Sequence, residues 1–103
     1  MVDVIIPIYN AYEYVEKCIN SVIKSSNLNE DRLILIDDKS PDSRIYELLE
    51  SFKEKYPNLN IIVLQNEKNI GFVGTVNRGM KYSDNDVILL NSDTEVTNQW
   101  IEK

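Results

Sequence analysis

Leu33-Ile34-Leu35-Ile36-Asp37-Asp38 passes directly from four apolar residues into two carboxylates. A short apolar run without polar alternation is typical of a strand in a parallel sheet, because both faces of such a sheet are covered. Further runs of the same kind occupy residues 2–8, 61–64 and 87–90. The pattern therefore predicts buried strands at these positions, arranged in one parallel sheet.

The segments between these runs have the spacing of amphipathic helices. Apolar residues recur at intervals of three and four over residues 15–23 and 45–52. Ser40-Pro41-Asp42 contains residue types that favour the beginning of a helix, so we expect the second helix to start there. A third helix is predicted over residues 72–82, and the first turns of another over residues 96–103.

Strands that alternate with helices predict an α/β fold with right-handed crossovers. We expect a Rossmann-like, three-layer arrangement in which helices cover a parallel sheet. Gly74 and Gly79 lower the helix propensity of the third helical segment. Residues 1–103 are expected to form a single domain.

The composition excludes several kinds of chemistry within these residues. The chain of 103 residues has no histidine and one cysteine, which rules out a Ser-His-Asp triad and a histidine-based metal site. Eleven basic and 17 acidic residues give a net charge of −6, which argues against binding to nucleic acid. The single Cys18 is interpreted as a small core residue in a reducing cytoplasm.

Ligands of open α/β sheets bind beyond the carboxyl ends of the strands, so the residues that follow each strand are the candidates. Pro7 ends the first strand, and Tyr9 offers a flat face for stacking on a base. Alternatively, Tyr9 is a core residue and Asn10 caps the first helix. After the second strand, one carboxylate of Asp37-Asp38 accepts a loop N–H, or the pair binds a base, a hydroxyl or a cation.

The third and fourth strands are also followed by polar residues. Asn69 and Gly71 follow the third, where Gly71 supplies a positive φ or a close ligand approach, or belongs to an ordinary loop. Asn91-Ser92-Asp93-Thr94-Glu95 follows the fourth and offers oxygen ligands for Mg²⁺ or Mn²⁺, or a helix cap. An aromatic ring and two acidic groups at one sheet edge suit a base, a ribose and a metal-bound diphosphate.

These motifs together resemble the nucleotide-sugar-binding half of inverting GT-A glycosyltransferases of family 2. The resemblance rests on the segments 4–10, 36–40, 69–79 and 90–94, in this order and at fitting spacings. It implies that Pro7 and Tyr9 line the base pocket, with Tyr9 packed on the ring. It implies further that Asp38 binds the pyrimidine ring N–H while Asp37 supports the loop. Asn10, Asn69 and Gly71 are also expected among the nucleotide-binding residues.

The same resemblance implies a metal site and a donor substrate. Asp93 matches the metal-binding acid of the family's D-x-D motif, and Asn91 stands in the place of its first aspartate, where its amide can contact ribose. The implied donor is a UDP- or dTDP-sugar, and the implied acceptor is a saccharide or a lipid-linked molecule. Since no residue matches the family's catalytic base, we expect the chain to be the donor-binding part of a longer enzyme.

Family members of this kind often work at the cytoplasmic face of the membrane, so the expected location is cytoplasmic, with peripheral membrane association of the longer enzyme. Two other interpretations are considered. Leu35-Ile36-Asp37-Asp38 also resembles the acidic pair of a receiver domain phosphorylated on aspartate, but that pair normally follows the first strand. A sugar-1-phosphate nucleotidyltransferase needs a glycine-rich basic loop after its first strand, and residues 9–13 contain neither Gly nor Arg.

Overall fold

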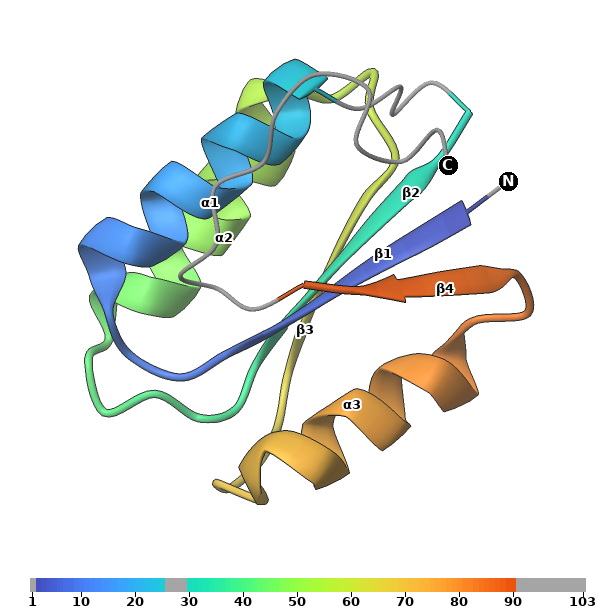
Figure 1. Cartoon of the computed structure of the whole chain (residues 1–103). Coiled ribbons are helices and arrows are strands. Elements are labelled where there is room, and N and C mark those ends of the chain that lie inside the picture. The colour runs from blue at the N-terminus through green and yellow to red at the C-terminus, as the bar shows by residue number, and fades with distance from the viewer. Residues whose placement is uncertain (1, 26–29, 91–103) are drawn as a thin grey trace.

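The computed structural model describes residues 2–25 and 30–90, and these form alternating strands and helices (Figure 1). In chain order the elements are β1 (Val2–Ile8), α1 (Tyr12–Ser25), β2 (Arg32–Asp37), α2 (Arg44–Lys55), β3 (Ile61–Gln65), α3 (Gly71–Tyr82) and β4 (Asp86–Leu89). The predicted alternation is confirmed. The helix predicted over residues 96–103 lies outside the described residues.

The described strands form one sheet in the order β3-β2-β1-β4, and each neighbouring pair is parallel. Helices α1 and α2 cover one face of this sheet, and α3 covers the other (Figure 1). The α/β fold with three layers is therefore confirmed. The chain extends from β1 to β2 and β3 in one direction and then returns through α3 to β4 on the far side of β1. Such a reversal is where parallel sheets bind ligands.

The core has two parts because the strands are buried on both faces. The larger part lies under α1 and α2 and includes Val4, Ile6 and Ile8 of β1. The smaller part contains Ile5, Ile34 and Ile36, which point toward the opposite face. The apolar stripe predicted for the first helix is buried at residues 15, 18, 19 and 22, so Cys18 is a core residue. Within the described residues, no helix is both long and apolar enough to span a membrane.

The predicted start of the second helix is wrong. Helix α2 begins at Arg44, and Ser43 precedes it without a side-chain capping bond. The Ser40 hydroxyl accepts a hydrogen bond from the backbone N–H of Asn10 at 2.8 Å instead. Asp42 accepts the N–H of Arg44 at 3.0 Å. A cap-like sequence therefore serves a loop-to-loop contact here, which local residue preferences cannot reveal.

Asp3 anchors the amino end of the sheet, opposite the predicted site. Its fully buried carboxylate accepts two hydrogen bonds from Arg32, at 3.0 and 2.8 Å, and others from Ser83 and Asn85. Burial alone would raise the pKa of Asp3, but the hydrogen bonds from these three residues outweigh it and lower the pKa. The cluster ties β1 and β2 to the turn before β4.

Replacing Asp3 by asparagine should lower the free energy of unfolding by about 2 kcal/mol at neutral pH, because Arg32 loses its buried partner. The lowered pKa of Asp3 gives a stabilisation that is full above the ordinary value of about 4 and is lost as the pH falls below it. Urea unfolding between about pH 7 and pH 3 should therefore show a smaller decrease in the free energy of unfolding with falling pH in Asp3→Asn than in wild type. Asp86→Asn, an exposed change at the beginning of β4, serves as the control; an equal loss of stability with falling pH in all three proteins would contradict the assignment.

Candidate functional site

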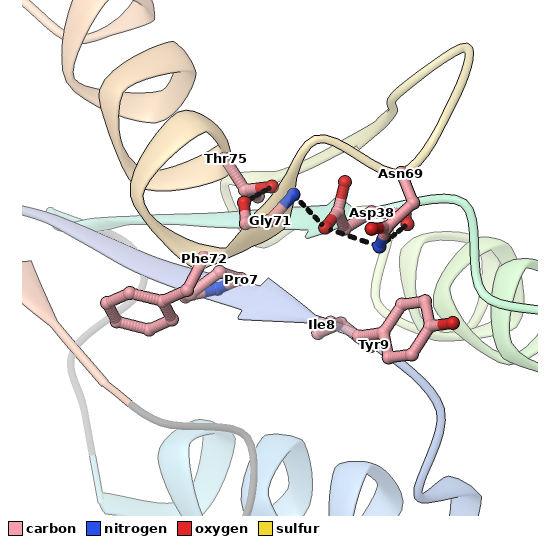
Figure 2. Close-up of a pocket in the computed structure, with 8 residues that line it drawn as sticks. All are labelled: Pro7, Ile8, Tyr9, Asp38, Asn69, Gly71, Phe72 and Thr75. Carbon is pink, nitrogen blue, oxygen red and sulfur yellow. Dashed lines mark hydrogen bonds between the residues drawn. The ribbon is translucent and has the colours of Figure 1, made fainter.

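A pocket of about 390 Å³ opens at the carboxyl edge of the sheet (Figure 2). It lies between the end of β1, the end of β2 and the loop that leads from β3 into α3. Its lining residues are Pro7, Ile8, Tyr9, Asp38, Asn69, Gly71, Phe72 and Thr75. The volume falls in the range of small-ligand sites. Five residues predicted from the sequence, namely Pro7, Tyr9, Asp38, Asn69 and Gly71, are thus brought to one cavity.

Asp38 is the buried acidic centre of this pocket, with 4% of its surface exposed. Its Oδ1 accepts hydrogen bonds from the Asn66 amide and the backbone N–H of Ile70, both at 2.8 Å. Its Oδ2 accepts from the Asn69 amide and the backbone N–H of Gly71, both at 2.9 Å. The carboxylate therefore holds the beginning of α3, where a negative charge is also favoured by the helix dipole.

Asn66 connects Asp38 to the third helix and was not singled out by the sequence analysis. Its amide nitrogen also contacts the Thr75 hydroxyl at 3.0 Å, and its side-chain oxygen accepts from Arg78 at 2.7 Å. Arg78 donates as well to the carbonyl of Gln65, the last residue of β3. The available sequence signal was the position of Asn66 directly after a buried strand.

Gly71 supplies the backbone conformation that this arrangement needs. Its φ is +85°, in the left-handed region that strongly favours glycine. This conformation starts α3 while directing the Gly71 N–H toward Asp38. The positive φ considered for this glycine is confirmed.

Two aromatic side chains border the pocket. Tyr9 is 49% exposed and Phe72 is 56% exposed, so both present ring surface to solvent. Figure 2 shows Tyr9 at one end of the cavity and Phe72, beside Pro7, at the other. The core interpretation of Tyr9 is wrong, since half of its surface is accessible. Phe72 was assigned only to a helix, although an aromatic residue directly after Gly71 was visible in the sequence.

Asn10 and Asp37 support the loops around the pocket and do not line it. The Asn10 side-chain oxygen accepts the N–H of Asp42 at 3.2 Å, which joins the loop after β1 to the loop after β2. Asp37 is buried, and its carboxylate accepts from the Ser40 N–H at 2.9 Å and the Gln65 amide at 3.1 Å. Asn10 therefore does not cap α1, because its side chain is engaged with the second loop.

The backbone of these two loops is strained. Positive φ values occur at non-glycine residues Asn10 (55°), Ala11 (60°) and Lys39 (55°). Such conformations cost free energy and persist where surrounding contacts enforce them. The cross-loop hydrogen bonds of Asn10 supply that enforcement at this edge of the sheet.

The predicted metal ligand Asp93 and the predicted ribose contact Asn91 lie outside the described residues. The described chain ends at Leu90, whose N–H donates to the Ile5 carbonyl of β1 at 3.0 Å. Among residues 2–25 and 30–90, no three acidic or cysteine side chains cluster as a metal site. Asp37 and Asp38, the pair that suggested a receiver domain, both accept hydrogen bonds from N–H donors.

Comparisons with known proteins agree with this geometry. The chain is 31% identical over 90 residues to a poly(ribitol-phosphate) beta-glucosyltransferase of Bacillus spizizenii. The aligned stretch covers 85% of this chain and 14% of that protein. It is 28% identical over 103 residues to the glycosyltransferase AglE of Haloferax volcanii, covering 99% of the chain and 33% of AglE. The chain thus spans a third or less of the length of these relatives.

A solved structure, S. aureus TarS in complex with UDP-GlcNAc, superposes with a TM-score of 0.80 at 28% identity, over 98% of this chain and 29% of that one. The same protein has been solved with UDP, at the same identity and TM-score. The sequence model described as glycosyl transferase family 2 matches residues 3–103, which is nearly the whole chain. This protein therefore belongs to glycosyl transferase family 2.

Proposed function

We propose that the pocket binds the nucleotide of a UDP- or dTDP-sugar, and that the protein supplies the donor site of an inverting glycosyltransferase. The observation that carries this proposal is the arrangement of an exposed tyrosine and a buried carboxylate in one cavity at the carboxyl edge of a family 2 fold. The binding of UDP and UDP-GlcNAc by TarS, which superposes over 98% of this chain, supports the choice of nucleotide.

The pyrimidine base is assigned to the space between Tyr9 and Asp38. Tyr9 offers a half-exposed ring on which a base can stack, and Pro7 adds apolar surface beside it. Asp38 is an acceptor that suits the ring N–H of uracil or thymine. Asn10 and Asp37 act indirectly, since they hold the two loops that carry these residues.

The diphosphate is assigned to a site where it binds a divalent cation, Mg²⁺ or Mn²⁺. Asp93 is the proposed protein ligand of this cation, and Asn91 is proposed to contact the ribose. The donor set suits such an ion, because hard cations take one or two carboxylates together with phosphate oxygens and water. Charge supports the same conclusion, since a chain with a net charge of −6 repels a diphosphate unless a cation lies between them. The bound cation would neutralise the diphosphate as a leaving group.

The acceptor is proposed to be a saccharide or a lipid-linked molecule. The Bacillus spizizenii relative is a poly(ribitol-phosphate) beta-glucosyltransferase, which supports an acceptor of the carbohydrate class. No described residue is assigned as catalytic base. Donor binding is therefore the part of the function that this chain can be tested for directly.

Isothermal titration should detect binding of UDP or dTDP in the presence of Mn²⁺ and binding at least about tenfold weaker when the metal is removed by a chelator. Asp93→Asn should reduce the effect of the metal, because it removes the proposed carboxylate ligand. Failure of both nucleotides to bind, with and without Mn²⁺, would refute the donor-site proposal.

Tyr9→Ala locates the base within the same titration. Loss of a stacking ring should weaken UDP binding by about tenfold or more. Tyr14→Ala is the matched control, since Tyr14 is 59% exposed on α1 and does not line the pocket. Equal affinities of these two variants would place the base elsewhere.

A further inference from the structure

The hydrogen-bonding capacity of Asp38 is already filled by the protein itself. A carboxylate offers about four lone-pair positions. Each oxygen of Asp38 accepts two N–H donors, from Asn66 and Ile70 at Oδ1 and from Asn69 and Gly71 at Oδ2. A pyrimidine ring N–H that donates to this carboxylate must therefore replace one of these donors.

The backbone donors and Asn66 cannot leave without disturbing the fold. The N–H groups of Ile70, the N-cap residue of α3, and of Gly71, its first residue, are backbone groups at the beginning of the helix. Asn66 is 4% exposed, and it is held by Arg78 and Thr75 as well as by Asp38. Moving Asn66 would leave buried polar groups without partners, and moving the two backbone groups would displace the beginning of α3.

Asn69 differs from the other donors because its amide belongs to the side chain of an exposed residue, whereas the others are backbone N–H groups or the buried Asn66. Its amide donates to Asp38 Oδ2 at 2.9 Å and to the Asp38 carbonyl at 3.2 Å. When it turns away, water can replace both contacts at small cost. Figure 2 shows the amide nitrogen next to the Asp38 carboxylate at the Tyr9 end of the pocket, where the base is assigned.

We infer that Asn69 is a displaceable positioning residue: its amide holds Asp38 at the acceptor position that the ring N–H takes, and a bound uracil or thymine exchanges with it. This inference rests on the proposed function. The exchange leaves the Asp38 carboxylate with a full set of hydrogen-bond donors before and after binding. A base can therefore take this position only if it has a ring N–H to donate. A base without that group leaves the amide in place and meets a filled acceptor.

The inference predicts that removing the amide improves binding. Asn69→Ala should bind UDP about fivefold more tightly than wild type, because the base no longer competes with an internal hydrogen bond. UDP methylated at the ring N–H cannot make the exchange, so its affinity should change little. The preference for UDP over the methylated analogue should therefore rise about fivefold. Asn58→Ala, an exposed asparagine in the turn between α2 and β3, should change neither affinity.

Nuclear magnetic resonance of the side-chain amides gives a second readout. The Asn69 NH₂ signals, identified by their loss in Asn69→Ala, should shift toward those of a solvated amide on addition of UDP and stay in place with the methylated analogue. Weaker UDP binding by Asn69→Ala, an unchanged preference, or unmoved Asn69 signals at saturating UDP would overturn the inference. These results leave the donor site intact, whereas absence of binding of both UDP and dTDP to wild type, with and without Mn²⁺, refutes the proposed function itself.

Discussion

Asp38→Ala is expected to lower the free energy of unfolding by about 4 kcal/mol and to abolish nucleotide binding. The substitution removes one buried carboxylate but leaves donors on Asn66, Ile70 and Gly71 without their acceptor. Hydrogen bonds to a charged group contribute about 1.5–3 kcal/mol each, and buried donors left unsatisfied add to the loss. The expected loss of about 4 kcal/mol is smaller than the sum of these hydrogen-bond contributions, because water can bond to the more exposed donors, of which Asn69 is one.

Urea unfolding followed by circular dichroism measures this effect, and Asp38→Asn provides a graded comparison. Asparagine keeps the shape and one acceptor oxygen, so its loss should be about half that of alanine. Asp84→Ala, on the exposed turn before β4, should change stability by less than about 0.5 kcal/mol. A loss below about 1 kcal/mol in Asp38→Ala would show that α3 does not depend on this carboxylate.

The fold could be predicted from the sequence because its determinants are local. Residue spacing alone predicts burial for the apolar run Leu33–Ile36 and for the helical stripe around Cys18. Both are buried as expected. The start of α2 was predicted incorrectly because Ser40, a residue typical of caps, bonds to Asn10, which is 30 residues away in the sequence. Spacing within one segment contains no information about such a partner.

The candidate site was predictable in position but not in its contacts. Topology brings the residues after parallel strands to one edge, so Tyr9, Asp38 and Gly71 could be grouped before the structure was known. The saturation of Asp38 could not be foreseen, because its partners lie 28 to 33 residues further along the chain. Phe72 was missed for a related reason: helical periodicity does not indicate which exposed residue borders a cavity.

Gly79 shows why glycines that weaken a predicted helix can still be required by the fold. A Cβ at this position would lie 2.9 Å from Ile5 Cγ2 and 3.0 Å from Ile36 Cδ1. Both isoleucines are fully buried in the sheet, so they have no free space to move into. The missing side chain lets α3 approach the sheet closely, and that approach brings the first turn of the helix to Asp38.

Gly79→Leu is therefore expected to lower the free energy of unfolding by about 4 kcal/mol, because four added carbon atoms must be accommodated in a filled core. Gly79→Ala should lose about 1 kcal/mol, since its gain in helix propensity partly offsets the contact with Ile5. Gly74→Ala is the matched control on the same helix. Its Cβ would meet the side chain of Ile70, which is 45% exposed and can move, so a gain of about 0.5 kcal/mol is expected. Urea unfolding of the three variants thus separates close packing from helix propensity: if Gly79→Ala and Gly74→Ala shift stability in the same direction, propensity dominates and the close approach of α3 is not required.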